Sequence, residues 1–535
     1  MTNRFLAAAA MAAMLVPAAL PAAETPVDTA KAEGSLYVQC DGNPNNMTTG
    51  ESVARLLSLA AVVGLLAPPP ESADAGKRKF GAEGVAACSA MIDGDKAEGN
   101  AQRRIALILA RAVHRIEAKD YDAAIADVGK ARAEAAAAKL TDDPYFNRST
   151  GLSFDQVEAA ALVRLGRVED AQRVSLTEAG HHPYSLVPLL TLNSYANLAS
   201  ADSDADIPHA KALSRIYPPM IDGAASRLEE LARFDESARL RADLVTFQSS
   251  AKDKEGKALP PSSLSVARAA LAHALAGQWD AAAASAERAR SIDATRLTDG
   301  KPEDMAIRLQ SSEVLDLYDV LLLAKQGNLD GARRKFTART RWLAPSFGAV
   351  LAANRLLYDG AAAADRTGQL AMPAAALWQE RADTARAELL VKDSDNKTLF
   401  ALIRPYLSAS AFESQSKAVW RTDKSKIFLK PSADKVADGS KIAFLYGVVS
   451  NVGFDAMMLH AALDARAQGK KGFTYMPITG NYLAALVRAG DPGDALMPDA
   501  LFLDADAVIA ALSPLIPDPE TLKARRAAKA KSGNK

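Results

Sequence analysis

The stretch from Ser262 to Ala294 limits what this chain can fold into more than any other part of the sequence. Its pattern predicts two helices, Leu264–Ala276 and Trp279–Ile292, joined by a turn at Gly277-Gln278. Alanines fall where the two helices would meet, and their small side chains let two helix backbones approach closely. These alanines are Ala269, Ala270, Ala282 and Ala289. The stretch therefore predicts a helical hairpin.

The order of residues in this hairpin resembles the tetratricopeptide repeat, in which a glycine precedes an aromatic residue and small residues follow at set intervals. Looser copies of the pattern recur, so that the resemblance covers about residues 105 to 345. The residues that carry the signature are Tyr121, Ala124, Gly166, Ala171, Pro183, Phe234, Gly277, Trp279, Ala282, Ala289, Gly327, Ala332 and Phe336. The resemblance implies a mainly α fold, an α-solenoid of stacked helical hairpins that binds a protein or peptide in a groove.

The spacing of the copies departs from a regular array. Ala124, Ala171, Ser237, Ala282 and Ala332 occupy equivalent positions, and they lie 47, 66, 45 and 50 residues apart. A regular tetratricopeptide array repeats about every 34 residues. We therefore expect degenerate repeats separated by insertions, that is, an irregular solenoid.

The first residues have the pattern of a secretory signal peptide. Arg4 supplies a positive charge, Phe5–Val16 is an apolar run, and Pro17 ends it before a group of small residues. The alternative is an uncleaved N-terminal anchor. A second apolar run, Leu56–Pro68, is too short to span a bilayer, which takes about 20 residues. We expect a periplasmic or secreted protein with no transmembrane segment after cleavage.

The chain contains two cysteines, Cys40 and Cys88, and both precede the repeats. In an exported protein an isolated pair predicts a disulfide. The alternative, a metal-binding or nucleophilic pair, lacks cysteine or histidine partners nearby in the sequence. The pair therefore predicts a stapled N-terminal cap.

The pattern changes after Trp420. Strands are predicted at Lys426–Leu429, Ile442–Val449 and Gly472–Ile478, with a helix at Phe454–Gln468. Alternating strands and helices predict a small α/β or α+β domain. The segment from Asp455 to Phe473 is similar to a small domain of bacterial envelope proteins. We expect a signal peptide over residues 1–23, the cap over 24–100, the repeat domain over 101–420, an α/β domain over 421–517 and a basic tail over 518–535.

Composition and motifs argue against several classes of function. The 64 basic and 64 acidic residues cancel, so no overall field favours nucleic acid. The motifs of serine hydrolases, zinc proteases, P-loop proteins and dinucleotide-binding enzymes are missing from the sequence. Ser414-x-x-Lys417 has the spacing of penicillin-recognising enzymes, but their other two motifs do not follow it in order. We expect no catalytic residue, cofactor or metal.

Three hypotheses about function remain open. The first is an exported scaffold that binds envelope proteins or peptides. The second is an enzyme or small-ligand-binding protein with its activity in the C-terminal domain, which a deep pocket lined by His460, Tyr475 or Asp455 would favour. The third is an architectural envelope protein. The sequence does not identify the partner or the oligomeric state.

Overall fold

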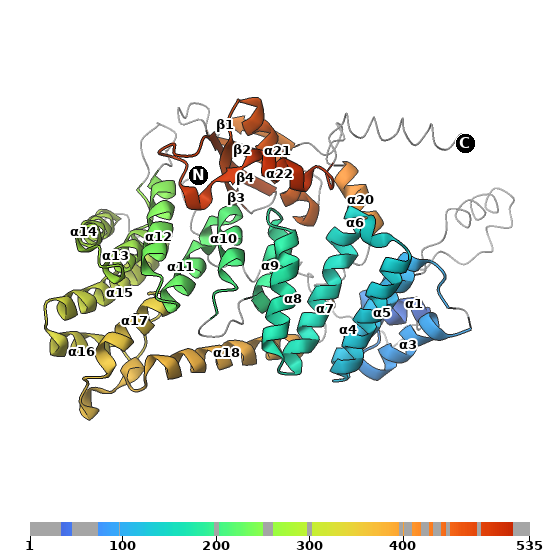
Figure 1. The fold of residues 1–535 in the computed structure, drawn as a ribbon, viewed down its shortest axis with the longest axis horizontal. Coiled ribbons are helices and arrows are strands. Elements are labelled where there is room, and N and C mark those ends of the chain that lie inside the picture. The colour runs from blue at the N-terminus through green and yellow to red at the C-terminus, as the bar shows by residue number, and fades with distance from the viewer. Residues whose placement is uncertain are drawn as a thin grey trace. The chain divides into compact units, whose positions relative to one another are not determined.

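The structure is a computed structural model and describes residues 34–44, 73–95, 97–196, 203–249, 260–296, 302–394, 400, 409–418, 427–431, 440–445, 450–478 and 483–516. The predicted signal peptide, the apolar run Leu56–Pro68 and the predicted tail lie outside these ranges. Within them the protein is mainly helical, with a small antiparallel sheet toward the C-terminus (Figure 1). None of the described helices combines the length and the apolar character that crossing a membrane requires.

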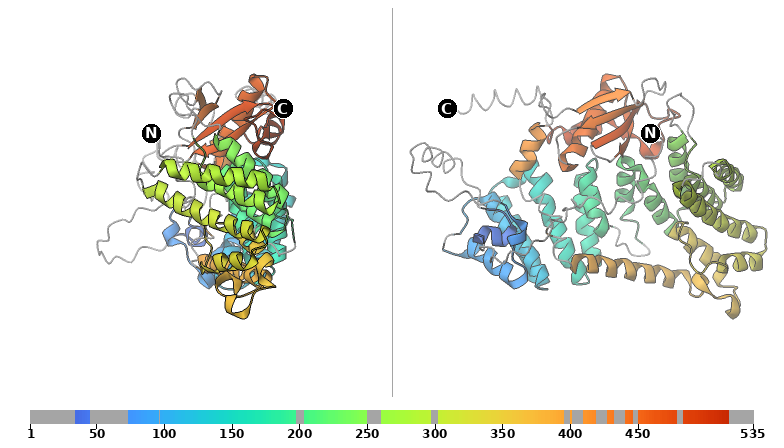
Figure 2. Two further views of the ribbon diagram at one scale, coloured as in Figure 1. Left: turned by 90° about the vertical axis from the view of Figure 1, so that its left-hand side faces the viewer. Right: turned by 180° about the vertical axis from the view of Figure 1, so that it is seen from behind.

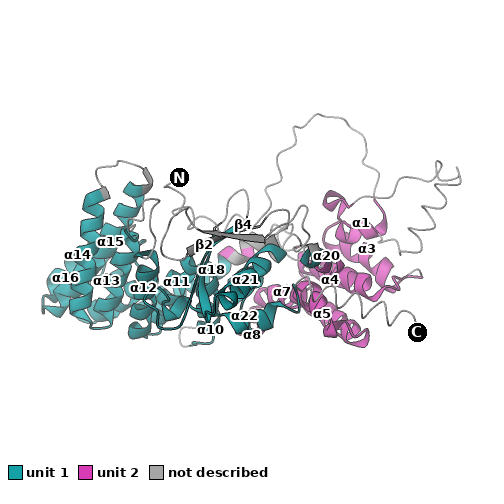
Figure 3. Ribbon diagram, turned by 90° about the horizontal axis from the view of Figure 1, so that it is seen from above, with its two compact units in different colours: residues 1–18, 179–387, 414–535 teal, residues 19–178, 388–413 magenta. Residues whose placement is uncertain are grey.

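The chain divides into two compact units (Figure 3). The first comprises residues 1–18, 179–387 and 414–535, and the second comprises residues 19–178 and 388–413. The domain limits expected from the sequence, near residues 100 and 420, remain predictions.

The second unit is helical where it is described. Its elements are α1 (Leu36–Asp41), η3 (Ala75–Lys77), α3 (Gly81–Asp93), α4 (Ala101–Glu117), α5 (Tyr121–Ala137), η4 (Leu140–Asp142), α6 (Pro144–Phe146), η5 (Asn147–Gly151), α7 (Leu152–Arg164) and most of α8 (Val168–His181). α4 is its central helix, because α1, α3, α5 and α7 all pack against it. Its apolar side chains are buried on nearly every side, among them Ile105, Leu107 and Ile108.

The first unit continues with paired helices. Its helices here are α9 (Leu186–Ala196), α10 (Ile207–Ile216), η6 (Pro218–Met220), α11 (Ile221–Glu230), α12 (Phe234–Ser249), α13 (Ser263–Leu275), α14 (Trp279–Arg296), α15 (Pro302–Lys325), α16 (Leu329–Thr337), α17 (Phe347–Tyr358), η7 (Ala363–Asp365) and η8 (Gly368–Leu370). α18 (Ala374–Ser394) and α20 (Ala409–Ala418) each have residues in both units. α11 packs on α12, α12 on α13, and α13 on both α14 and α15. The left view of Figure 2 shows green and yellow-green helices of this group running side by side.

The hairpin predicted for Ser262–Ala294 is confirmed as α13 and α14, and its helix boundaries lie close to the predicted ones. The four alanines expected at the contact, Ala269, Ala270, Ala282 and Ala289, are all buried in one core. Larger residues that follow in the chain complete that core, including Tyr318 of α15, Phe336 of α16 and Trp342 of the segment between α16 and α17. Small residues therefore set the close approach of α13 and α14, and bulky residues fill the space beyond them.

A five-stranded sheet forms in the C-terminal part of the described chain. Its strands are β1 (Ile427–Pro431), β2 (Ser440–Leu445), β3 (Gly472–Ile478), β4 (Leu483–Gly490) and β5 (Leu503–Asp504), in the order β1-β2-β4-β3-β5. The helices α21 (Ser450–Ala467) and α22 (Ala505–Leu512) and the short η10 (Asp499–Leu501) accompany it.

Every pair of neighbouring strands in this sheet is antiparallel. The expectation of an α/β domain is therefore corrected to α+β, since α/β domains are built on parallel strands with helical crossovers. The difference arises from β4, which sequence reasoning missed. β4 follows β3 closely and pairs with it along its whole length, without a helix between them.

Helices cover both faces of the sheet. Tyr475 and Met476 are consecutive in β3, so their side chains point to opposite faces. Tyr475 lies near Asp455 of α21, whereas Met476 packs with the core of α10, α11 and α12. Leu501 of η10 joins the same core, and Asp243 of α12 accepts a 3.0 Å hydrogen bond from the Ala500 amide. The sheet and these helices thus share one hydrophobic core.

Candidate functional site

The described hairpins share one turn geometry. Five residues that stand two positions before the second helix of a hairpin have a left-handed backbone: Lys119 (φ 64°), Gly166 (77°), Ala232 (58°), Gly277 (73°) and Gly327 (81°). At the central turn the Gln278 amide donates to the His273 carbonyl (2.9 Å) and the Gly277 amide to the Ala274 carbonyl (3.1 Å). These are the two hydrogen bonds of the Schellman motif, which ends a helix.

The same pair of bonds occurs at the other four turns, with the amides of Lys119, Asp120, Gly166, Arg167, Ala232, Arg233, Gly327 and Asn328 as donors. Left-handed backbone favours glycine, because any Cβ is strained there. Two of the five turns nevertheless use Lys119 and Ala232, so the chain keeps the turn geometry even without glycine.

A small residue follows each turn at the same distance. It stands three positions after the first residue of the second helix, and it has no exposed surface in any of the five hairpins. These residues are Ala124, Ala171, Ser237, Ala282 and Ala332. A fully buried position of this kind admits no larger side chain unless the two helices separate.

The other signature residues also have structural positions. Tyr121, Phe234 and Trp279 begin the second helices and are partly buried. Lys325 lies 4.4 Å from the centre of the Trp279 ring, as a cation–π pair. Phe336 and Ala289 are buried, and Pro183 lies in the turn between α8 and α9. The signature residues therefore shape the hairpins, and a partner would have to be contacted by other, exposed residues.

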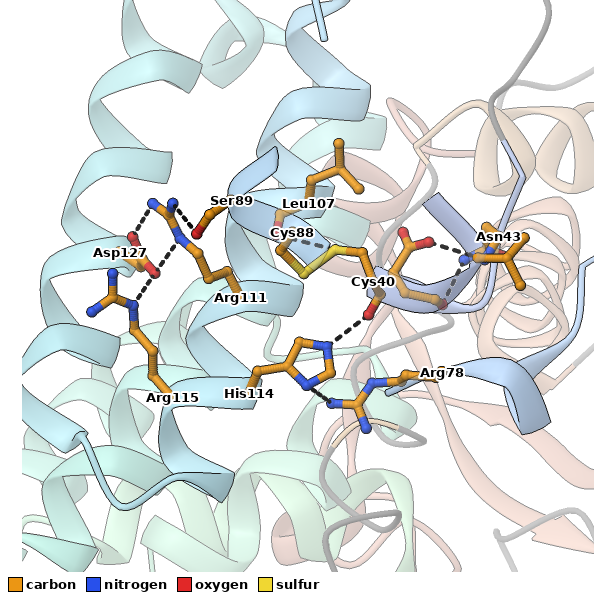
Figure 4. The surroundings of a disulfide bond; sticks show 12 residues. Cys40, Asn43, Arg78, Cys88, Ser89, Leu107, Arg111, His114, Arg115 and Asp127 are labelled. Carbon is orange, nitrogen blue, oxygen red and sulfur yellow. Dashed lines mark hydrogen bonds and ion pairs between the residues drawn. A yellow bond between two sulfur atoms is a disulfide. The ribbon is translucent and has the colours of Figure 1, made fainter. Parts of the chain in front are cut away.

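The cysteine pair lies at disulfide distance. The Sγ atoms of Cys40 and Cys88 are 2.08 Å apart, and the bond links α1 to α3 beside α4 (Figure 4). Nε2 of His114 donates to the Cys40 carbonyl oxygen at 2.7 Å, which ties α1 to α4 as well. Asp41 forms a buried ion pair with Arg103 of α4. The short α1 is therefore held by one covalent bond and by several polar contacts, which also include the Tyr37 hydroxyl donating to Glu98 (3.0 Å) and the Lys79 amide donating to the Gln39 carbonyl (2.9 Å).

A second buried ion pair lies next to the disulfide. Arg78 and Glu117 are both almost fully buried and 2.5 Å apart, and Glu117 also lies 2.8 Å from Nδ1 of His114. Burial acts to raise the pKa of Glu117, but the His114 hydrogen bond and the Arg78 charge outweigh it, so the pKa lies below its usual value. Burial lowers the pKa of Arg78. The arrangement stabilises the cap and leaves no open coordination or reaction site among these groups.

Glu229 and the ion pairs of the neighbouring Asp222 join α11, α12, α13 and the residue before α17 in the first unit. Glu229 of α11 is 1% exposed and accepts hydrogen bonds from Ser237 Oγ (2.6 Å) and Arg241 Nε (3.0 Å) of α12. It also accepts one from Ser346 Oγ, just before α17. Arg241 and Arg268 of α13 each pair with Asp222 at 2.6 Å. We call the six residues together the Glu229 cluster: Asp222, Glu229, Ser237, Arg241, Arg268 and Ser346.

α17 approaches α11 very closely beside this cluster. A Cβ on Gly348 would stand 2.4 Å from the Ser226 carbonyl oxygen and 2.6 Å from the Glu229 Cβ. Only glycine fits at this position. The Glu229 cluster is therefore a clamp between helices, with its charges balanced and its oxygens occupied.

His460, Tyr475 and Asp455, the residues proposed for a C-terminal pocket, are not among those that line the hollow described below. Asp455 and Tyr475 are buried, and His460 is partly buried. Burial and then the Asp455 charge raise the pKa of Tyr475, so the phenol stays protonated. A hollow of about 340 Å³ lies nearby on β4, and its lining residues are Arg488, Ala489, Asp494, Ala495, Leu496 and Met497. In the part of the chain that the structure describes, no three His, Cys, Asp or Glu side chains are placed to hold a metal ion.

No protein family, no curated protein and no solved structure matches this chain.

Proposed function

We propose that this protein is an exported interaction scaffold: an irregular, tetratricopeptide-like α-solenoid that binds envelope proteins or peptides. The observation that carries the proposal is the shared hairpin geometry. Five turns combine left-handed backbone with a fully buried small residue at one fixed distance. Stacked hairpins of this kind expose long helical surfaces, and such surfaces are used to bind extended partners.

Two further observations support the proposal, one for export and one for degenerate repeats. The Cys40–Cys88 bond fits an oxidising compartment, because disulfides are rare in the cytosol. The unequal spacing of the hairpins fits degenerate repeats, with α9 and α10 inserted between the second and third hairpins. The signature residues are engaged within the hairpins, so partner binding would use exposed side chains between them.

The test combines fractionation with crosslinking in intact cells. We expect the tagged protein in the exported fraction, and a reproducible set of crosslinked partners. Ala282→Leu should weaken the hairpin and reduce these crosslinks severalfold, because residue 282 is fully buried. Ala284→Leu is the matched control, since the same change falls on an exposed position of α14.

Three results would contradict the proposal. One is a cytosolic location of the full-length chain. Another is the absence of crosslinks above background with the wild type. The third is full retention of the crosslinks in an Ala282→Leu protein whose hairpin is shown by hydrogen exchange to have opened.

A further inference from the structure

The hollow on β4, here called the β4 hollow, contains two opposite charges and an apolar wall. Its lining residues are Arg488, Ala489, Asp494, Ala495, Leu496 and Met497, and its volume is about 340 Å³. Sites that bind small molecules begin at about this size, and they combine mostly apolar walls with a few polar groups. The β4 hollow has this composition, which makes it a candidate site for a small ligand.

Arg488 is a buried cation on a strand inside the sheet. It is only 6% exposed, and its backbone pairs with Ser440 of β2 and with Thr474 of β3. Arg488 also interacts with another residue of the chain. A guanidinium group has five N–H donors, so such an interaction is compatible with binding an anionic group in the hollow as well.

Asp494 lies in a loop whose backbone is fixed by local hydrogen bonds. Its Oδ2 accepts from the Asp491 amide at 2.9 Å, and the Met497 amide donates to its carbonyl at 2.8 Å. Met497 lies across the end of β4, since a Cβ on Gly490 would stand 2.6 Å from the Met497 Cγ. A loop that is already ordered loses little freedom when it binds a ligand, which favours binding.

The two charges of the β4 hollow do not neutralise each other. Among the described residues, no ion pair or hydrogen bond joins Asp494 to Arg488. Lys470, whose charge acts on Asp494, pairs with Asp491 at 2.8 Å and does not belong to the lining. A cation and an anion that stay separate in one hollow match a ligand that carries both charges, and this match requires no net local charge.

We propose that the β4 hollow binds a small zwitterion with an apolar body, of which an aliphatic α-amino acid is the simplest form. Arg488 would bind the carboxylate through a forked pair of hydrogen bonds, and Asp494 would accept hydrogen bonds from the ammonium group. The four apolar lining residues would contact the side chain of the ligand. A simple anion would be repelled by Asp494 and a simple cation by Arg488, so both fit less well.

The binding should be weak and sensitive to salt. Asp494 is exposed, and salt screens an exposed charge more strongly than a buried one such as that of Arg488. The inference does not depend on the proposed scaffold function, because the β4 hollow contains none of the hairpin signature residues.

The experiment is isothermal titration calorimetry of the purified full chain with three probes. L-Leucine has both charges, N-acetyl-L-leucine lacks the ammonium group, and L-leucinamide lacks the carboxylate. We expect leucine to bind at least tenfold more tightly than either analogue, because each analogue loses one charge-assisted contact.

Two variants assign the charges. Asp494→Asn should weaken leucine binding at least tenfold and leave N-acetylleucine binding unchanged, since that probe has no ammonium group to lose. Arg488→Gln should weaken leucine binding at least tenfold and leave leucinamide binding unchanged. A purely structural role of either residue would not produce this crossed pattern.

Matched controls make the same changes outside the hollow. Asp506→Asn on α22 and Arg466→Gln on α21 alter exposed residues that do not belong to the lining, and both variants should bind leucine like the wild type. Circular dichroism checks the folding of each variant. If Arg488→Gln fails to fold, Arg488→Lys takes its place, because it keeps the charge but loses the forked donors and should weaken leucine binding severalfold.

Four outcomes would overturn the inference. Leucine could fail to bind at millimolar concentration, or the three probes could bind equally well. Leucine could bind without being affected by Asp494→Asn or by the Arg488 variants. Finally, Asp494→Asn could weaken N-acetylleucine as much as leucine, which would show that the change acts through the fold of the loop.

Discussion

Single residues carry the strain and the buried charge of this protein. Lys119 and Ala232 adopt left-handed backbone where three other turns have glycine. Such a conformation costs a non-glycine residue about 1–2 kcal/mol. Gly277 shows the complementary case, because a Cβ there would meet nothing within 4 Å and only its backbone angle matters.

The first prediction therefore concerns these turns. Lys119→Gly and Ala232→Gly should each raise the free energy of unfolding by about 0.5–1 kcal/mol, as the released strain exceeds the extra entropy of glycine in the unfolded chain. Gly277→Ala should lower it by about 1 kcal/mol. Chemical denaturation measures all three. As the control, Ala283→Gly in α14 should lower stability by about 1 kcal/mol, and a loss of stability in Lys119→Gly would contradict the argument.

The second prediction concerns the Glu229 cluster. Glu229→Ala would leave Arg241, Ser237 and Ser346 without their shared acceptor in a buried position. We expect a loss of about 3–5 kcal/mol in the free energy of unfolding, as for other broken buried pairs. Glu236→Ala removes more exposed pairs to Arg233 and Lys211 and should cost less than about 1 kcal/mol. Equal effects of the two changes would show that the cluster is not a clamp.

The third prediction concerns acid. Burial lowers the pKa of His209 to about 4, and its Nε2 donates to Asn193. In the unfolded chain His209 therefore binds a proton once the pH falls below about 6.5. In the folded protein it binds that proton only near pH 4. Stability should fall as the pH drops through this window, by up to about 3 kcal/mol in total.

The measurement is denaturation against pH for the wild type and His209→Asn. The variant should lose this part of the pH dependence, and His273→Asn, a change at a partly exposed histidine, should not. Burial raises the pKa of Asp155 to about 7, which contributes a slope of the opposite sign. The difference between the wild type and His209→Asn cancels that contribution. Identical curves for the two proteins would refute the assignment.

Elements differ in how far local sequence decides them. α13 and α14 follow from their own residues, since alanines, a turn glycine and an aromatic start are all local signals. β4 does not. Its residues Leu483–Gly490 are rich in alanine, and they form a strand because both of their neighbours are strands, β2 and β3. Strand propensity depends on such cross-strand partners.

α1 is the element that depends most on a covalent bond. It has six residues, too few for a stable helix on its own. The disulfide closes a loop with a sequence separation of 48 residues, which contributes about 4 kcal/mol in the loop-entropy description. The fourth prediction is that Cys40→Ser with Cys88→Ser lowers stability by about 2–4 kcal/mol and raises amide exchange in Leu36–Asp41 first.

Thiol labelling provides the control for that experiment. The wild-type protein should show no reactive thiol until it is unfolded in reductant, because both sulfurs are buried. Two reactive thiols in the native protein would contradict the bond. Unchanged exchange in α1 of the double variant would show instead that the His114 and Arg103 contacts hold the helix without it.

At the scale of the whole molecule, packing joins segments that the sequence separates. The C-terminal sheet was expected to stand apart from the helical hairpins. Met476 and Leu501 instead pack with Ile207 and Leu240, and Asp243 binds an amide 257 residues away. Local patterns contain no information about which buried faces meet, so this shared core could not be predicted.

The sequence by itself determined the helical hairpins and the cysteine pairing. The reason is that turn residues and small contact residues act within one hairpin, and that two cysteines allow a single intramolecular bond. The tertiary structure alone decided the antiparallel sheet and the Glu229 cluster. Each of these depends on contacts between distant residues, such as Ser346 with Glu229, 117 positions apart.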